Sequence, residues 1–488
     1  MAAVKGNRIS GRRAEMEVLD RAMKSSEAEF VAIYGRRRVG KTFLVREFFG
    51  DAICFELTGL HGVSMSDQLE NFAEALGKAM GSGVLPRTPA SWREAFRQLE
   101  QFLESSRPAR SGDKRVVFLD ELPWLDTRRA KFCSALEHFY NSWASRQEDL
   151  ILVVCGSAAS WMIRNVVQAK GGLYNRVTRR IRLLPFTLSE TETFLKSRRV
   201  ELTRHQIVEL YMVLGGIPHY LKEAEPGLST PQIVDHACFS RQGLLRDEFG
   251  KLYASLFDDA EQHVRIVETL SRKPEGLTRN ELLAAAGLVS GGTATKRLEE
   301  LEESGFLQRH VPFGKKENDS LYRLADELSL FHIDWIRRLG NRSPGDGYFI
   351  QQYQSPAWRA WSGYAFEGVC LKHIPQLKAA LGISGIDSTE SSWRYREPGA
   401  SKKRGAQIDL LIDRRDHTVN LCEIKYSDTK FNIDKKYANV LRNKKEVFRR
   451  ITRAKKNLFI TMITTFGVTD NAYAKELIAI SLTVDALF

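Results

Sequence analysis

Long hydrophobic runs and cysteine pairs are missing from this sequence. None of its 488 residues belongs to an apolar stretch of about 18 residues, so no membrane-spanning helix is predicted. The first eight residues, Met-Ala-Ala-Val-Lys-Gly-Asn-Arg, lack the apolar segment of a signal peptide. The six cysteines are scattered, and none forms the Cys-x-x-Cys pair that often holds zinc. We therefore expect reduced core thiols, a cytoplasmic location and no association with a membrane.

Acidic residues are the minority of the charged residues. Lysine and arginine number 73 against 60 aspartates and glutamates, which gives a formal net charge of +13. Such an excess favours anionic partners, namely nucleic acid, nucleotides or an acidic membrane surface. The charge does not choose among them, because a solvated basic face gives the same count. Apolar residues make up 43% of the chain, enough for packed cores, and the length predicts roughly three domains.

The pattern of apolar residues divides the chain into four parts. In residues 1–186, continuous apolar runs such as 115–119 and 150–155 alternate with helical patterns. This alternation predicts an α/β core with a parallel sheet that is covered on both faces. Residues 187–258 are predicted to be a helical lid, and residues 259–338 to be three helices and a hairpin, as in a winged helix. After a turn-rich linker, residues 348–488 are predicted to form a second α/β domain.

A phosphate-binding loop is predicted between an apolar strand at residues 30–34 and a helix beginning near residue 43. Glycines at both ends of the loop let the backbone approach phosphate, and amide groups at the helix start point toward it. Lys41 is expected to reach the β- and γ-phosphates of ATP, and the hydroxyl of Thr42 is expected to bind Mg²⁺. The loop comprises Gly35, Arg36, Arg37, Arg38, Val39, Gly40, Lys41 and Thr42.

Polar residues at the ends of the following strands complete the predicted nucleotide site. Asp120 ends an apolar strand and is expected to hold Mg²⁺, while Glu121 is expected to orient the attacking water. Ser157 ends the next strand and is a candidate sensor of the γ-phosphate, although an ordinary strand-to-helix turn is equally consistent. Arg176 is a candidate for acting on the ATP of a neighbouring subunit, with a solvated basic face as the alternative.

Two further motifs resemble known ATPase families. Residues 7–19, which contain a Gly-Arg-x-x-Glu box at 11–15, resemble the segment that opens STAND and related AAA+ ATPases. Residues 215–221, Gly-Gly-Ile-Pro-His-Tyr-Leu, resemble the lid motif of the archaeal-type ATPase family. The resemblance covers residues 7 to about 330. It implies an AAA+-like fold, a place for Pro218 near adenine, and a correspondence between Arg176 and the family's arginine before the last core strand.

Two predicted strands of the last domain place acidic residues in apolar surroundings. Asp409 lies in an apolar strand at 407–413, and Glu423 and Lys425 lie in a second strand at 419–425. Glu423 and Lys425 share a face because strand positions i and i+2 point the same way. If the two strands pair as a hairpin, Asp409 lies beside Glu423, and Mg²⁺ would relieve the repulsion of their charges. A surface hairpin with a Glu–Lys pair is the alternative.

This constellation resembles the PD-(D/E)XK nuclease superfamily. The resemblance implies a restriction-endonuclease-like α/β fold with a mixed central sheet flanked by helices. Its metal-binding acids correspond to Asp409 and Glu423, its lysine to Lys425, and its helix acid to Glu367 in the amphipathic segment 361–371. The sequence departs from the pattern because no proline precedes Asp409. A metal-activated water beside Lys425 would attack a phosphodiester.

Basic residues crowd the same domain. They would bind phosphate backbones without reading bases, although charge runs are usually solvated faces. The predicted winged helix offers a second DNA surface at 293–297 and 315–316, or else a plain protein contact. The basic residues of the last domain are Lys402, Lys403, Arg404, Lys435, Lys436, Lys444, Lys445, Arg449, Arg450, Lys455 and Lys456.

Together these features predict an ATPase that controls a Mg²⁺-dependent nuclease. The expected cofactors are ATP and Mg²⁺, and the expected partners are nucleic acid, DNA in the first place, and further copies of the chain. A defence role against foreign nucleic acid is suggested by analogy of architecture. Two alternatives stay open: a signalling or assembly switch whose last domain binds nucleic acid without cutting it, and a regulator that uses the winged helix.

Overall fold

The structure is a computed structural model that divides into two compact units, Met1–Pro185 with Glu303–Gly305, and Phe186–Glu302 with Phe306–Phe488. It describes residues 9–81, 83, 85–106, 114–127, 129–168, 173, 175–257, 259–340, 345–396 and 405–488. Asn7 and Arg8 of the Gly-Arg-x-x-Glu segment lie outside the described residues, as do Lys402, Lys403 and Arg404. Each unit is considered by itself.

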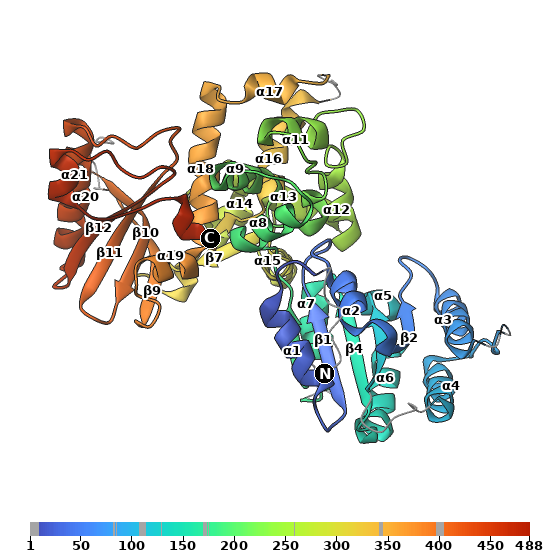
Figure 1. Ribbon diagram of the computed structural model, residues 1–488. Helices are drawn as coiled ribbons and strands as arrows, with labels where there is room; N and C mark the ends of the chain where they lie inside the picture. Colours follow the sequence, from blue (N-terminus) through green and yellow to red (C-terminus); the bar gives the residue numbers. More distant parts are fainter. Residues whose placement is uncertain are drawn as a thin grey trace. The chain divides into compact units, whose positions relative to one another are not determined.

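The first unit contains a five-stranded parallel sheet in the order β2-β3-β4-β1-β5 (Figure 1). Every residue of β3 and β4 is buried, because helices cover the central strands on both faces. The predicted α/β core with a parallel sheet is therefore confirmed. The strands are β1 (Glu29–Tyr34), β2 (Ile53–Thr58), β3 (Arg115–Asp120), β4 (Leu150–Gly156) and β5 (Arg179–Arg182).

Aromatic residues pack the helices of this unit together. The rings of Phe96 and Phe139 stack 5.0 Å apart, and the rings of Trp92 and Phe132 meet edge to face at 4.7 Å. These contacts join α4 to α6 above the sheet. The helices are α1 (Arg13–Met23), α2 (Lys41–Phe49), α3 (Met65–Met80), α4 (Trp92–Ser105), α5 (Leu122–Leu125), α6 (Phe132–Ser142) and α7 (Ala159–Met162).

The second unit begins with a helical segment. Thr187 caps the first helix, since its hydroxyl accepts the backbone N–H of Glu190 and its own N–H is bound by the Glu190 carboxylate. Gly216 allows a close approach of two backbones, because a Cβ atom there would lie 1.9 Å from the carbonyl oxygen of Phe186. The helices are α8 (Leu188–Ser197), α9 (Arg204–Leu214), α10 (Pro218–Leu221), α11 (Thr230–Cys238) and α12 (Glu248–Leu256).

Three helices and a small antiparallel sheet of order β6-β8-β7 follow. The three helices and the β7–β8 hairpin follow one another as predicted, β6 was not predicted, and the description as a winged helix stays a prediction. They are α13 (Ala260–Ser271), β6 (Leu277–Thr278), α14 (Arg279–Ala285), α15 (Gly292–Glu303), β7 (Leu307–His310) and β8 (Leu321–Leu324). Helix α16 (Glu327–Phe331) leads toward the last part of the chain.

The C-terminal part contains a separate five-stranded mixed sheet of order β13-β12-β11-β10-β9 (Figure 1). Strands β9, β10 and β11 are antiparallel neighbours, whereas β11, β12 and β13 are parallel. Phe448 and Leu441 of α20 pack against this sheet. The elements are α17 (Tyr348–Gln352), α18 (Pro356–Lys372), α19 (Ile374–Ala380), β9 (Ser388–Tyr395), β10 (Ala406–Arg414), β11 (Thr418–Lys425), α20 (Lys435–Thr452), β12 (Asn457–Thr464), α21 (Ala472–Leu477) and β13 (Ile478–Leu482).

The cysteines are not joined in disulfides. All six cysteines are free thiols, and Cys155, Cys238, Cys370 and Cys422 are buried. Among the described residues, no helix combines the length and the hydrophobicity that crossing a membrane requires.

Candidate functional site

The loop between β1 and α2 depends on glycine at its start. Gly35 has φ +152°, and a Cβ atom added to it would lie 2.2 Å from the carbonyl oxygen of Leu183, which follows β5. Gly40 has φ +93° immediately before α2 and serves as its N-cap. The start of the loop therefore lies against the backbone that follows β5, and only a residue without a side chain fits at Gly35.

Gly35→Ala is expected to destabilise the protein by about 2–3 kcal/mol, because the new methyl group collides with a backbone carbonyl. We also expect ATP turnover to fall about tenfold, since the phosphate-binding loop must shift. Gly81→Ala is the matched control: Gly81 has φ +63° but open space around it, so only about 1 kcal/mol is expected. Urea unfolding and an ATPase assay measure both effects, and equal losses in the two variants would contradict the prediction.

Lys41 is held inside the loop by backbone carbonyl groups. Its side chain is buried, and Nζ donates hydrogen bonds to the carbonyl oxygens of Gly35 at 3.0 Å and Arg36 at 2.9 Å. Burial lowers the pKa of this ammonium group, and the nearby charge of Glu121 opposes that effect. A buried cation with only carbonyl partners attracts anionic groups strongly, which is the property that phosphate binding requires.

Thr42 and Asp120 lie next to each other, although 78 positions separate them in the sequence. The Thr42 hydroxyl donates to Oδ2 of Asp120 at 2.7 Å. Burial raises the pKa of Asp120, and the bond from Thr42 lowers it in part. A hydroxyl and a carboxylate at the phosphate-binding loop are oxygen donors of the kind that Mg²⁺ takes. The residues present therefore fit a nucleotide-bound Mg²⁺ ion.

Glu121 is fixed in place by Ser157 at the end of the neighbouring strand. Oε2 of Glu121 accepts hydrogen bonds from the backbone N–H of Ser157 at 3.0 Å and from its hydroxyl at 2.7 Å. Glu121 itself has φ +47°, so its backbone turns sharply after β3. The structure thus shows Ser157 positioning the carboxylate that the sequence analysis assigned to water activation. A role of Ser157 toward the γ-phosphate stays a prediction.

Arg12 links the Gly-Arg-x-x-Glu segment to the phosphate-binding loop, a contact that sequence analysis missed. Its guanidinium donates to the carbonyl oxygen of Val39 at 3.2 Å and lies 3.5 Å from Glu15. Arg12 is only 4% exposed and adopts φ +58°. The segment therefore contacts the phosphate-binding loop through the guanidinium group of Arg12.

The other residues predicted for the nucleotide site, Arg37, Arg176 and Pro218, lie in three different places. Arg37 lies over the ring of Trp124, with 5.6 Å between the guanidinium carbon and the ring centre. Arg176 is exposed and precedes β5, whose first residue pairs with Val31 rather than with the loop end of β1. Arg176 therefore lies toward the end of the strands that is away from the phosphate-binding loop, and its action on a neighbouring subunit stays a prediction. Pro218 begins α10 in the second unit, and its place near adenine also stays a prediction.

A second cluster of charged groups lies on the β10–β11 hairpin of the second unit. Leu410 pairs with Cys422, so extending this register places Asp409 opposite Glu423. Nζ of Lys425 is 2.8 Å from Oε1 of Glu423 and 4.0 Å from Oδ2 of Asp409. The hairpin therefore brings together the two acids and the lysine selected from the sequence.

Helix α20 contributes two further groups to this cluster. Nζ of Lys444 lies 2.5 Å from Oε2 of Glu423, and the hydroxyl of Tyr437 donates to Oε1 at 2.9 Å. Lys444 is one of the basic residues of the last domain that were predicted to bind phosphate backbones, and no sequence pattern singled out Tyr437. Their separation of seven residues puts them on one face of a helix, which is the signal that would have linked them. Burial disfavours the charged form of Glu423, but Lys444 and Lys425 outweigh it and lower its pKa.

The pKa of Asp409, unlike that of Glu423, is raised by its surroundings. Its side chain is 10% exposed, and Oδ2 accepts the backbone N–H of Ile424 at 3.1 Å. Burial, followed by the charges of Glu423 and Glu367, raises the pKa of Asp409 to about 7. Glu367 is in turn paired with Arg323 of β8 at 2.6 Å, so a residue from outside the C-terminal sheet holds the helix acid.

The donor set limits which metal the hairpin fits. In the part of the chain that the structure describes, no group of three or more His, Cys, Asp or Glu side chains converges as metal ligands would. Two carboxylates suit Mg²⁺, which keeps several water ligands, and not a structural Zn²⁺ site with four protein ligands. Burial is the largest cause of the raised pKa of Asp409, and the charges of Glu423 and Glu367, which a bound cation would offset, raise it further.

Asp409→Asn is expected to raise the melting temperature by about 3 °C or more in EDTA at pH 8. An acid whose pKa is higher in the folded than in the unfolded protein costs stability as pH rises between those two values. For Asp409 that window runs from the ordinary pKa of an aspartate, 3.8, to about 7, so the difference in melting temperature between variant and wild type should close on acidification to pH 4. Thermal melts test this. Asp413→Asn on the same strand removes a partner of Lys456 and should not raise the melting temperature.

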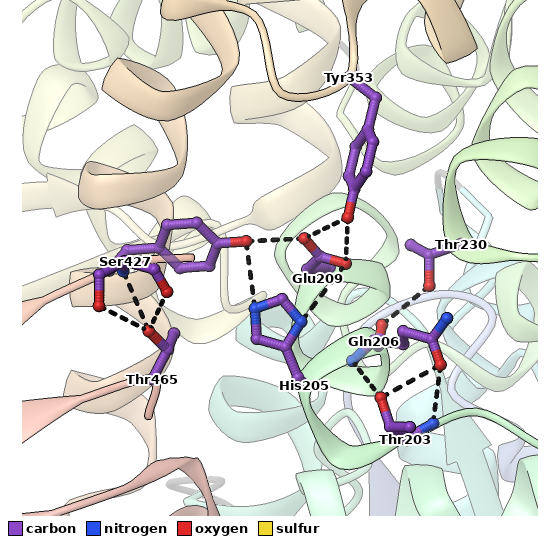
Figure 2. Close-up of polar contacts among 9 residues, drawn as sticks. Thr203, His205, Gln206, Glu209, Thr230, Tyr353, Ser427 and Thr465 are labelled. Atoms are coloured by element: carbon purple, nitrogen blue, oxygen red, sulfur yellow. Dashed lines mark hydrogen bonds and ion pairs between the residues drawn. The ribbon is translucent and has the colours of Figure 1, made fainter. Parts of the chain in front are cut away.

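The residue after Lys425 ties the end of β11 to α9. The Tyr426 hydroxyl donates to buried Glu209 at 2.7 Å, and the Tyr353 hydroxyl donates to the same carboxylate at 2.8 Å (Figure 2). His205 lies within 3.8 Å of Glu209. Burial, with the Glu209 charge, raises the pKa of both tyrosines, so both phenols stay protonated donors. These contacts restrain the position of Lys425.

The first unit and the start of the second match a known ATPase family. The model of the family described as an ATPase domain predominantly from Archaea matches residues 10–224. Together with the geometry of the phosphate-binding loop, this match shows that the chain carries an archaeal-type P-loop ATPase domain. The match spans less than half of the chain, and the C-terminal sheet lies outside it.

Among curated proteins, an uncharacterised protein of Methanocaldococcus jannaschii is 23% identical over 441 residues, 89% of this chain and 92% of that protein. An uncharacterised ATP-binding protein of the same organism is 46% identical over 37 residues, 8% of this chain and 63% of that protein. The first similarity extends through the C-terminal part of the chain, so the two proteins share more than the ATPase domain.

Two solved structures are among the matches to this chain. The Walker-type ATPase of Pyrococcus abyssi has a TM-score of 0.48 and 17% identity, and the match covers 68% of this chain and 99% of that one. The ORC2 protein of Aeropyrum pernix has a TM-score of 0.42 and 16% identity, with 71% of this chain and 96% of that one covered.

Proposed function

We propose that this chain is an ATP-regulated, Mg²⁺-dependent nuclease. The observation that carries the proposal is the convergence of Asp409, Glu423 and Lys425 on one hairpin. Structural hairpins have little use for a buried carboxylate with a raised pKa beside a second carboxylate, whereas a site for phosphodiester hydrolysis needs both. The mixed sheet supports a restriction-endonuclease-like fold for this part of the chain.

At the hairpin, the chain's own residues place charge around a phosphodiester. Mg²⁺ bound to Asp409 and Glu423 would lower the pKa of a bound water and so supply a nucleophile. Lys425 lies between the two acids and can donate to a non-bridging phosphate oxygen, where negative charge develops. Lys444 and Tyr437 hold Glu423 from the helix side, and Arg323 holds Glu367.

At the ATPase site too, some residues would interact with the phosphates and others would hold those residues in position. Lys41 would exchange its two loop carbonyls for the β- and γ-phosphates of ATP. Thr42 and Asp120 would hold Mg²⁺, and Glu121, fixed by Ser157, would orient the water that attacks the γ-phosphate. The regulation of one activity by the other, assembly of several copies of the chain, and a defence role are further parts of the proposal.

A cleavage assay tests the proposal. Purified full-length protein is incubated with end-labelled single- and double-stranded DNA and RNA, in Mg²⁺ or EDTA, with and without ATP. We expect shortened products in Mg²⁺ alone or with ATP, none in EDTA, and none from Asp409→Asn in either buffer. If no substrate is shortened while ATP turnover proceeds, the nuclease proposal is wrong.

A second candidate function is a nucleotide-driven assembly switch whose C-terminal part binds nucleic acid without cutting it. One observation favours it: the ammonium groups of Lys425 and Lys444 both form ion pairs with the carboxylate of Glu423. A carboxylate with two cationic partners has less need of a metal ion. ATP-dependent oligomers in light scattering, with bound but intact oligonucleotide, would support the switch over the nuclease.

A further inference from the structure

A cavity of about 440 Å³ opens beside Asp409 in the second unit. One wall comes from β6, β8 and the turn before β6, and the other from β9 and β10. Asp409 and Glu367 both line it, so the cavity reaches the candidate phosphodiester site at Asp409, whereas Glu423 and Lys425 are not among the lining residues. We call it the Asp409 cavity.

Specific contacts hold the two walls of the Asp409 cavity together. The backbone N–H of Phe313 donates to the carbonyl oxygen of Ser392 at 2.9 Å, and His310 lies 3.0 Å from the Ser392 hydroxyl. Burial lowers the pKa of His310 to about 4, so this contact keeps one protonation state at neutral pH. The ring of Phe313 also packs 5.4 Å from that of Phe448. The cavity is therefore built from fixed elements.

Basic side chains around the Asp409 cavity differ in whether they are already paired. Arg323 is paired with Glu367, and Arg394 lies 3.6 Å from Glu275. The remaining basic lining residues, Lys273, Lys315 and Arg396, have no carboxylate within 4.0 Å among the described residues. They are exposed at the cavity, and three unpaired cations next to a hydrolytic site favour a ligand with several negative charges.

We infer that the Asp409 cavity binds a single strand of nucleic acid, with phosphates on Lys273, Lys315 and Arg396, and leads the strand to Asp409. This inference rests on the proposed nuclease function, whose substrate it specifies. Pockets of about 300–1,000 Å³ hold one drug-sized molecule. A nucleotide is of that size and a duplex is much larger, so the strand enters unpaired. Contacts to phosphate make the binding independent of base sequence.

Binding is measured by fluorescence anisotropy with full-length protein in EDTA, where no cleavage occurs. The probes are labelled 12-nucleotide oligo-dT, oligo-U and a DNA duplex of equal length. The test variant is Lys273→Glu with Lys315→Glu. The matched control is Arg272→Glu with Lys316→Glu, which changes the charge equally at exposed neighbouring positions that do not line the cavity.

We expect the test variant to bind oligo-dT at least about tenfold more weakly than wild type, and the control variant less than about threefold more weakly. The slope of log K against log salt should fall by about 1.4 in the test variant, at about 0.7 for each lost phosphate contact. Wild type should bind either single strand more tightly than the duplex.

Equal losses in the test and control variants, or tighter binding of the duplex than of the single strands, would overturn the inference. ATP turnover and a thermal melt show whether each variant is folded, and Arg396→Gln repeats the test with one neutral substitution. The nuclease proposal can fail independently. Intact oligonucleotide in Mg²⁺ together with the expected anisotropy results would leave the strand site standing without cleavage.

Discussion

ATP turnover by a Lys41→Ala variant is expected to fall at least about 100-fold. Lys41 is the buried cation of the phosphate-binding loop, and in the absence of nucleotide its ammonium group has two backbone carbonyls as partners. The phosphates of ATP can replace those carbonyls as partners of the Lys41 ammonium group, whose positive charge no other side chain of the loop neutralises. In the transition state for phosphoryl transfer, charge spreads over the γ-phosphate oxygens, and a positioned cation stabilises it.

The control for Lys41→Ala is Lys24→Ala in the same unit. Lys24 is 73% exposed and pairs only with Asp20, one helical turn away, so its loss should change ATP turnover less than about twofold. Undiminished turnover in Lys41→Ala would contradict the assignment of the nucleotide site. The same variant in the cleavage assay shows whether nucleotide binding gates the second site: unchanged cleavage would separate the two activities.

Lys425→Ala is expected to lower Mg²⁺-dependent cleavage at least about 100-fold while ATP turnover stays at the wild-type level. Lys425 lies 2.8 Å from Glu423 and 4.0 Å from Asp409, and those charges raise its pKa against the effect of burial. It is therefore a permanent cation at the point where a phosphodiester would meet the two carboxylates. Its loss removes a donor to the developing charge and leaves Glu423 with the ammonium group of Lys444 and the hydroxyl of Tyr437.

Lys456→Ala is the matched control for Lys425→Ala. Lys456 also pairs with a carboxylate of β10, Asp413 at 2.6 Å, but at the turn end of the hairpin and away from Glu423. Cleavage should change less than about twofold in this variant. Lys425→Arg keeps the charge but not the compact ammonium group, so we expect partial activity. Cleavage by Lys425→Ala at the wild-type rate would exclude the proposed role.

The nucleotide site was predictable because its parts are local in the sequence or end adjacent strands. Residues 35–42 are continuous in the sequence, with Lys41 and Thr42 in the first turn of α2, and the strand and helix followed from apolar periodicity. Asp120 was predictable because carboxyl ends of parallel strands meet at one edge of the sheet. The bond between Ser157 and Glu121 was not predictable, since both residues had been assigned to ligands and not to each other.

The hairpin site was predictable only for the residues that the strands themselves carry. Alternation along β10 and β11 placed Asp409, Glu423 and Lys425 on one face. Arg323 lies 44 positions before its partner Glu367, in a strand of another sheet, and no local pattern links them. Tyr437 and Lys444 reach Glu423 only because α20 packs on the sheet through Phe448 and Leu441.

By itself, the sequence determined the chemical groups, their order along the chain, and the elements that carry them. The P-loop and the acidic strands could be identified because loop, strand and helix patterns depend on interactions among residues close in sequence. The tertiary structure alone decided which carboxylate has a raised pKa, since burial and the charges around Asp409 depend on packing between distant segments. It also decided that Leu183 closes over Gly35 and that Arg12 supports Val39. The same packing forms the Asp409 cavity, because one wall comes from residues 273–323 and the other from residues 392–409.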